Sequence, residues 1–369
     1  MSTSTATEPT PVGSPPGEDE RVSSSHWWAP ILRRPEIGAM AGALAIFLFF
    51  TVRTDSFLEP AGASTWIFNA SSIGIMAVAV SLLMIGGEFD LSAGAMIGTT
   101  GLTTGILMTE FDTNVWVAIL VALAIALFIG AVNGYLVMWT GLPSFIVTLG
   151  TFFVLQGVNL AVTKILIDKV SVTGLQNADG YSDGRRLFGS KLDIDMPWIP
   201  WLEDTDVKTT LTLYAATFWF VGVTALATWV LLRMRAGNWI FAVGGSQHSA
   251  LQIGVPVQRT KVRLFMTTAA AGWLVGMLQL FKTTTVQSTT GVGQEFIFII
   301  CAVVGGCLLT GGYGSAIGAA FGALIYGMVQ QGIPQAGWDN DWLYAFLGVM
   351  LLGAVLVNNW VKTRAESMR

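Results

Sequence analysis

Charge is scarce in this chain. Asp, Glu, Lys and Arg make up 11% of its 369 residues, whereas a soluble domain carries about 25%. Hydrophobic residues make up 53%, and apolar runs near the length that crosses the roughly 30 Å hydrocarbon core of a bilayer recur along the sequence. The composition excludes an ordinary soluble domain and predicts an all-α polytopic membrane protein.

Groups that carry catalysis or bind metals are also few. The only histidines are His26 and His248, and no GxxxxGK[ST] phosphate loop occurs, so no zinc set, Ser–His–acid triad or ATP site can be assembled. Cys301 and Cys307 point in different directions on a helix and are predicted to be buried thiols. We therefore predict no enzymatic activity, cofactor, metal site or nucleic-acid partner.

About ten transmembrane helices are predicted. The apolar runs are 37–53, 64–86, 91–108, 115–139, 144–165, 210–232, 263–281, 295–310, 314–333 and 342–359. Basic residues gather in cytoplasmic loops, and the loop 232–263 carries Lys and Arg without any acid. Ten spans place this loop and both termini in the cytoplasm. The acidic loop 166–209 then lies outside, where Trp198 and Trp201 either anchor at the headgroups or contact a partner.

The sequence divides into three parts. Residues 1–35 are rich in Ser, Thr, Pro and acids, which predicts a disordered cytoplasmic tail. This tail is not a signal peptide, because the first apolar run begins only near Ile37. A transmembrane domain is expected over 36–360, followed by a basic cytoplasmic tail over 361–369.

Glycines recur at four-residue spacing. The pairs Gly130 with Gly134 and Gly318 with Gly322 predict helices that approach closely, because packing between helices in a bilayer favours small residues. The segments "GGEFDLSAGAMIGTTG" and "GGCLLTGGYGSAIGAAFG" each place a glycine pair before a helix of small residues. Their likeness suggests an internal duplication.

The basic loop contains "AVGGSQHSALQIGVPV". Ser246 can cap a short helix that Gly254 ends, and this helix would display Gln247, Leu251 and the flanking Val255. Such a helix fits a groove on another protein, although an ordinary loop lying on lipid headgroups explains the spacing equally well.

Four motifs in order resemble the permease subunits of ABC importers for monosaccharides, the ribose and xylose permease family. They are "GGEFDLSAG" at 86–94, "GAVNGYLVMWTGLPSFIVTLGT" at 130–151, "IFAVGGSQHSALQIGV" at 240–255 and "GVGQEF…VVGGCLLTGGYGSAIGAAFGAL" at 291–324. The resemblance covers about residues 40–359. The chain departs from the family pattern at Ile297, where an acid is frequent, and at Leu308, where a serine is usual.

The resemblance implies a multi-pass subunit in a bacterial cytoplasmic membrane that forms a sugar pathway with a second copy or a close relative. Cytoplasmic ATPase subunits would bind below and an extracytoplasmic sugar-binding protein above. The short helix would be the coupling helix that enters the ATPase, with contacts from Ser246, Gln247, His248, Ala250, Leu251 and Gly254. The rival interpretation is a secondary transporter or channel acting alone.

Glu88 and Asp90, the two acids of "GGEFDLSAG", are interpreted differently. Asp90 or Ser92 is expected to cap the third span, whereas Glu88 has no obvious capping role and either contacts the sugar or bonds a neighbouring helix. Asn133 has the same alternatives, and Glu295 is expected to be an acid at the start of a helix. The candidate pathway residues are Glu88, Phe89, Asp90, Asn133 and Glu295.

Overall fold

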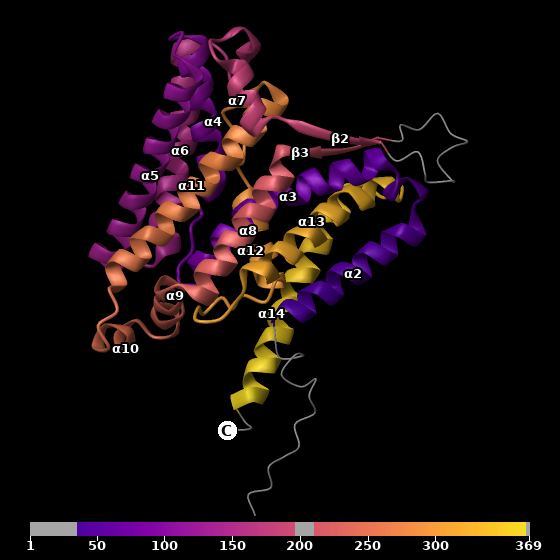
Figure 1. Cartoon of the computed structure of the whole chain (residues 1–369). Coiled ribbons are helices and arrows are strands. Elements are labelled where there is room, and N and C mark those ends of the chain that lie inside the picture. The colour runs from indigo at the N-terminus through magenta and orange to yellow at the C-terminus, as the bar shows by residue number, and fades with distance from the viewer. Residues whose placement is uncertain (1–34, 196–209, 367–369) are drawn as a thin grey trace, which may run out of the picture.

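The computed structural model describes residues 35–195 and 210–366 (Figure 1). Three predictions concern residues outside these ranges. They are nearly all of the N-terminal tail, the roles of Trp198 and Trp201, and the last residues of the basic tail. The described chain is mostly helical, and seven of its helices are long and apolar enough to cross a membrane. The predicted class, an all-α polytopic membrane protein, is confirmed.

A helix lies at each predicted span. These helices are α2 (Pro35–Arg53), α3 (Pro60–Ile85), α4 (Ala93–Thr109), α5 (Val115–Thr140), α6 (Ser144–Ile167), α8 (Ala215–Arg233), α11 (Val257–Thr283), α12 (Gln294–Val304), α13 (Ala316–Gln335) and α14 (Trp342–Glu366). Because α12 has only 11 residues, or about 17 Å at 1.5 Å per residue, it cannot cross a bilayer as a helix alone. The count of about ten spans therefore stays a prediction.

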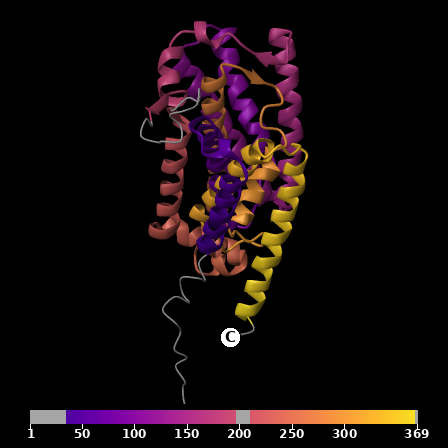
Figure 2. The same ribbon diagram turned by 90° about the vertical axis from the view of Figure 1, so that its right-hand side faces the viewer.

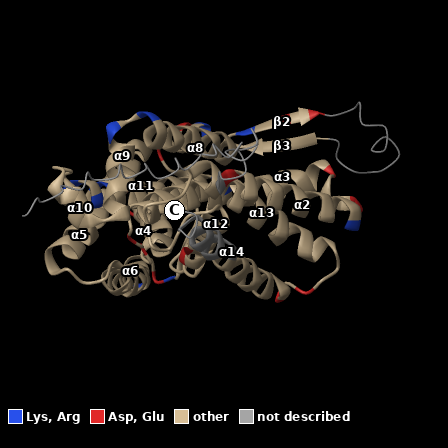
Figure 3. Cartoon of the chain, turned by 90° about the horizontal axis from the view of Figure 1, so that it is seen from below, with Lys and Arg blue, Asp and Glu red and all other residues tan. Residues whose placement is uncertain are grey.

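The two ends of the bundle carry different short elements. The helices α9 (Arg235–Gly245) and α10 (Gln247–Gln252) lie at the lower end in Figure 1, and α7 (Tyr181–Phe188) lies at the upper end. We call the lower end of the bundle the α10 end and the upper end the α7 end. Figure 2 shows α8 and α14 on opposite edges of the bundle. In the view from below, the ribbon is mostly uncharged, as Figure 3 shows.

Two short two-stranded sheets contain the strands. The first pairs β1 (Ser171–Val172) with β4 (Val286–Gln287), and the second pairs β2 (Lys191–Asp195) with β3 (Thr210–Tyr214), both antiparallel. The prediction of a span from residue 210 is therefore wrong at its start. Residues 210–214 are bonded to β2 as a strand, and the helix begins only at Ala215.

The eighth predicted span, 295–310, is also wrong in its extent. Its helix, α12, ends at Val304 because Gly306 takes a φ of +91° that closes the turn. The amide of Cys307 donates to the carbonyl of Ala302 at 3.0 Å. The end of α3 has the same form, since Gly87 has a φ of +83° and the amide of Glu88 donates to Leu83 at 3.1 Å. The two segments that resemble each other in sequence thus end their helices alike.

Close helix contacts occur at the glycines that the spacing singled out. A Cβ at Gly134 would come 2.7 Å from Cα of Val262, which places α5 against α11, and a Cβ at Gly322 would overlap the carbonyl of Cys301, which places α13 against α12. Cys301 and Cys307 are both free and buried, which confirms the prediction for these thiols.

Candidate functional site

The break between α3 and α4, residues 86–92, lies at the α10 end of the bundle. The amide of Gly312 donates to the carbonyl of Ile85 at 2.8 Å. A Cβ at Gly87 would come 3.4 Å from Cα of Gly244, the penultimate residue of α9. The break therefore meets the α12–α13 loop and the segment that leads into α10.

Asp90 and Ser92 join the break to the start of α4. One carboxylate oxygen of Asp90 accepts a hydrogen bond from the amide of Ser92 at 2.9 Å and another from its hydroxyl. Of the two residues predicted as alternative caps, Asp90 or Ser92, Ser92 makes no side-chain capping bond, because its hydroxyl donates to Asp90. Asp90 thus accepts from the backbone N–H of Ser92, the residue directly before α4.

Neighbouring helices hold the rest of this segment. The side chain of Asn133 on α5 donates to the hydroxyl of Ser92 at 3.0 Å, and it accepts from Thr151 on α6 at 2.6 Å. The amide of Phe89 donates to the hydroxyl of Ser144 at 3.0 Å. Asn133 is fully buried. These bonds satisfy polar groups of a non-helical segment inside an apolar bundle.

Glu88 forms a buried ion pair that the sequence did not reveal. Its carboxylate bonds to the ammonium group of Lys261 on α11, and the exposed fractions of the two residues are 8% and 5%. The same ammonium donates to the side-chain carbonyl of Gln247 on α10 at 2.9 Å. In the sequence, Lys261 was only one more positive charge in a basic loop, since its partner lies 173 positions away.

Glu295 lies in the first turn of α12, as predicted. Its carboxylate accepts from the amide of Gly293 at 3.0 Å. A Cβ at Gly94 would overlap this carboxylate, so Glu295 lies beside the first turn of α4. The five candidate pathway residues therefore surround the beginning of α4, and Phe89 is partly buried against the main core.

The short helix α10 has one anchored face and one free face. The hydroxyl of Ser246 accepts from the amide of Ser249 at 3.3 Å, and Gly254 follows with a φ of +81°. Ala250 packs inward in a small apolar cluster together with Val255. The expectations that Val255 is displayed and that Ala250 contacts a partner are therefore wrong, because both residues are buried. Leu251 is 55% exposed.

Two buried polar groups without partners lie near α4 and α12, and sequence reasoning missed both. The amide nitrogen of Asn159 on α6 and the side-chain oxygen of Gln294 have no hydrogen-bond partner among the described residues. Asn159 is 5% exposed. A Cβ at Gly98 of α4 would come 3.6 Å from its amide nitrogen and 2.6 Å from the carbonyl of Thr290.

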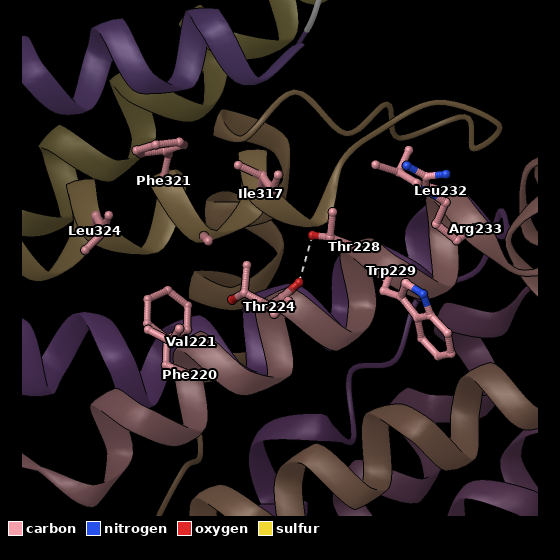
Figure 4. A pocket seen from close by; sticks show the side chains of 12 residues that line it. Phe220, Val221, Thr224, Thr228, Trp229, Leu232, Arg233, Ile317, Phe321 and Leu324 are labelled. Atoms are coloured by element: carbon pink, nitrogen blue, oxygen red, sulfur yellow. Dashed lines mark hydrogen bonds between the residues drawn. The ribbon is translucent and has the colours of Figure 1, made fainter.

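A large groove elsewhere in the molecule has a different character. It occupies about 550 Å³ between α8 and α13 and is lined almost entirely by apolar side chains, among them Phe220, Trp229 and Phe321 (Figure 4). Its hydroxyls come from Thr224 and Thr228, and Thr228 donates to the backbone of Thr224 at 2.7 Å. Such a surface suits hydrocarbon better than a polar solute.

A polytopic helical chain with a polar helix break beside a short, partly exposed helix at one end of the bundle has the organisation of a membrane transport subunit. The chain matches the family described as "Branched-chain amino acid transport system / permease component" over residues 62–355, and it belongs to this family.

Several characterised relatives are similar over most of their length. The chain is 29% identical over 286 residues to the ribose import permease protein RbsC of Escherichia coli (strain K12), covering 77% of this chain and 81% of the relative. It is 26% identical over 361 residues to the xylose transport system permease protein XylH of the same strain, covering 88% and 92%. The autoinducer 2 import system permease protein LsrD of Salmonella paratyphi B is 28% identical over 322 residues, covering 85% and 90%. No solved structure matches the chain significantly.

The buried pair predicts a stability effect at Glu88. Glu88→Gln leaves the Lys261 ammonium without its counter-charge in the interior, and we expect a loss of about 3–5 kcal/mol of stability. Thermal unfolding of the purified protein in detergent measures the effect. The control is Glu110→Gln, because Glu110 is exposed. Equal melting temperatures for the two variants would contradict a buried, paired Glu88.

Proposed function

We propose that the chain is the permease subunit of an ATP-binding-cassette importer for a monosaccharide in a bacterial cytoplasmic membrane. ATP hydrolysis takes place in partner ATPase subunits, an extracytoplasmic binding protein delivers the sugar, and a second copy or a close relative completes the pathway. The relatives named for ribose and xylose transport support the substrate class. The observation that carries the proposal is the exposed helix α10 in the segment that matches the coupling-loop motif.

The same proposal includes ten membrane crossings and cytoplasmic termini. The direction of the chain supports this topology. The helix α3 begins beside β3, where Ser64 accepts from the amide of Thr212 at 2.8 Å, and it ends at the α10 end. Residues 286–312 lead from β4 to the α10 end, combining α12 with turns on both sides of it. The Lys and Arg residues of the 232–263 loop support a cytoplasmic position for the α10 end.

The composition of α10 supports docking to an ATPase. Leu251 and Ile253 are 55% and 76% exposed in a loop whose charges are all positive. Apolar side chains on a short helix that is anchored from behind suit a groove on a partner protein. In this proposal Ser246, Gln247, His248, Leu251 and Gly254 face the partner, and Ala250 anchors the helix.

A first prediction concerns this docking. Leu251→Glu places a charge in the apolar contact, and we expect the copurified amount of the partner ATPase to fall by about tenfold or more, as for a central interface residue. Affinity purification of the tagged permease with its ATPase measures the loss. Leu187→Glu is the matched control, since Leu187 is an exposed leucine on α7 at the other end. Full retention of the ATPase by Leu251→Glu would contradict the assignment of α10.

A second prediction separates the importer from a carrier or channel acting alone. Cells that express the permease with its partner subunits should take up labelled ribose or xylose, and depletion of ATP should abolish uptake because hydrolysis drives each cycle. A protonophore applied while ATP is maintained should leave uptake unchanged. Uptake that survives ATP depletion but fails with the protonophore would favour the secondary transporter.

For the sugar pathway we propose the polar surface where α4, α6 and the start of α12 meet. It includes the surroundings of Glu88, Phe89, Asp90, Asn133 and Glu295. The unpartnered groups of Asn159 and Gln294 support this position, because a sugar carries hydroxyls that both donate and accept hydrogen bonds. An unpaired buried amide costs about 1–3 kcal/mol, which a passing ligand would recover.

A third prediction uses this cost. Asn159→Leu removes the unpaired amide at nearly constant volume, so we expect unchanged or higher thermal stability. We also expect a higher KM for uptake, by about fivefold to a hundredfold, if the amide bonds the sugar. Melting temperature and uptake kinetics of the same variant give the two readouts. A stable variant with the wild-type KM would exclude Asn159 from the pathway.

A further inference from the structure

Lys261 connects three elements that are far apart in the sequence. Its backbone belongs to α11, its ammonium pairs with Glu88 in the α3–α4 break, and the same ammonium donates to Gln247 on α10 at 2.9 Å. Gln247 is itself exposed, so the connection runs from the surface helix into the buried break. Among the described residues, this is the only salt bridge with both side chains buried.

Burying an ion pair costs desolvation energy, so the contacts that compensate for this cost show which elements hold the pair in place. Two charges removed from water regain their desolvation energy only when they meet closely and their remaining hydrogen-bonding groups are satisfied. Here the second partner of the ammonium, Gln247, comes from α10. A displacement of α10 therefore either removes a hydrogen bond from a buried charge or draws the ammonium with it, and in the second case the break must follow to keep the ion pair intact.

A second contact joins the same elements through the backbone. Gly244, next to the last residue of α9, packs so closely on the end of α3 that a Cβ would overlap the carbonyl of Ile85, and it would lie 2.6 Å from the amide of Gly312. Gly312 donates to that same carbonyl at 2.8 Å. Gly244, in the segment that leads into α10, thus contacts both the α3–α4 break and the α12–α13 loop.

We propose that Lys261 is a positioning residue that ties α10 to the α3–α4 break, so that movement of α10 on the ATPase is passed to the start of α4. The glycine contact at Gly244 extends this movement to the α12–α13 loop. The inference rests on the proposed function and adds the residues through which α10 acts on the pathway.

The first test removes the connection without leaving a lone charge. Glu88→Gln combined with Lys261→Met removes both charges, and such replacements of buried pairs are often neutral for folding. In the reconstituted complex with ATPase and binding protein, we expect assembly with the ATPase to persist and the number of ribose or xylose molecules transported per ATP to fall by about fivefold or more. A double variant that is stable and fully coupled would overturn the proposal.

A variant at Gln247 separates the connection from mere packing. Gln247→Leu removes the acceptor for the ammonium and should lower the transport ratio relative to the wild-type complex. Because Gln247 also lies on the helix proposed to dock, the amount of bound ATPase is measured for the variant and for the wild type. A variant that binds the ATPase normally and keeps the wild-type ratio would count against the connection.

The glycine contact offers a matched pair of neighbours. A Cβ at Gly244 overlaps the end of α3, whereas a Cβ at Gly245 meets nothing within 4 Å. We expect Gly244→Ala to lower the transport ratio and Gly245→Ala to preserve it; identical ratios would contradict the proposed joint. A wild-type complex that transports neither sugar with ATP would overturn the proposed function itself, and this inference with it.

Discussion

Backbone and charged groups that leave a helix inside a membrane protein must find partners within the protein, because hydrocarbon offers none. Residues 86–92 meet this constraint through hydrogen bonds to Ser144 and Asn133 and through the ion pair between Glu88 and Lys261. The bonded partners come from α5, α6 and α11. The break therefore fixes how these helices sit around the start of α4, and the position of α10 follows through Gln247.

The same constraint acts where α12 ends. Gly305 and Gly306 close the helix with the same pattern of backbone bonds that Gly86 and Gly87 form at α3. The two closed turns leave short loops that meet at Gly244. In the proposed importer, both broken helices would thus lie close to α10, the helix proposed to contact the ATPase.

Much of the architecture could be predicted from the sequence because bilayer-spanning helices depend on local composition. Every predicted span overlaps a helix, and the ends of α10 at Ser246 and Gly254 were predicted from capping chemistry. The errors have two kinds of cause. Residues 210–214 form a strand because β2, an element elsewhere in the chain, lies beside them. Ser92 does not cap for a local reason, because its hydroxyl bonds Asp90 two residues earlier.

The sequence by itself determined the membrane class, the helix positions, the family and the location of α10, since each depends on hydropathy, capping residues or ordered motifs. Only the tertiary structure decided the partner of Glu88 and the burial of Val255. It also decided which polar groups remain unpaired, as at Asn159. Ion pairs and hydrogen bonds between helices depend on distances across the bundle, and residues such as Glu88 and Lys261 carry no signal of their separation in space.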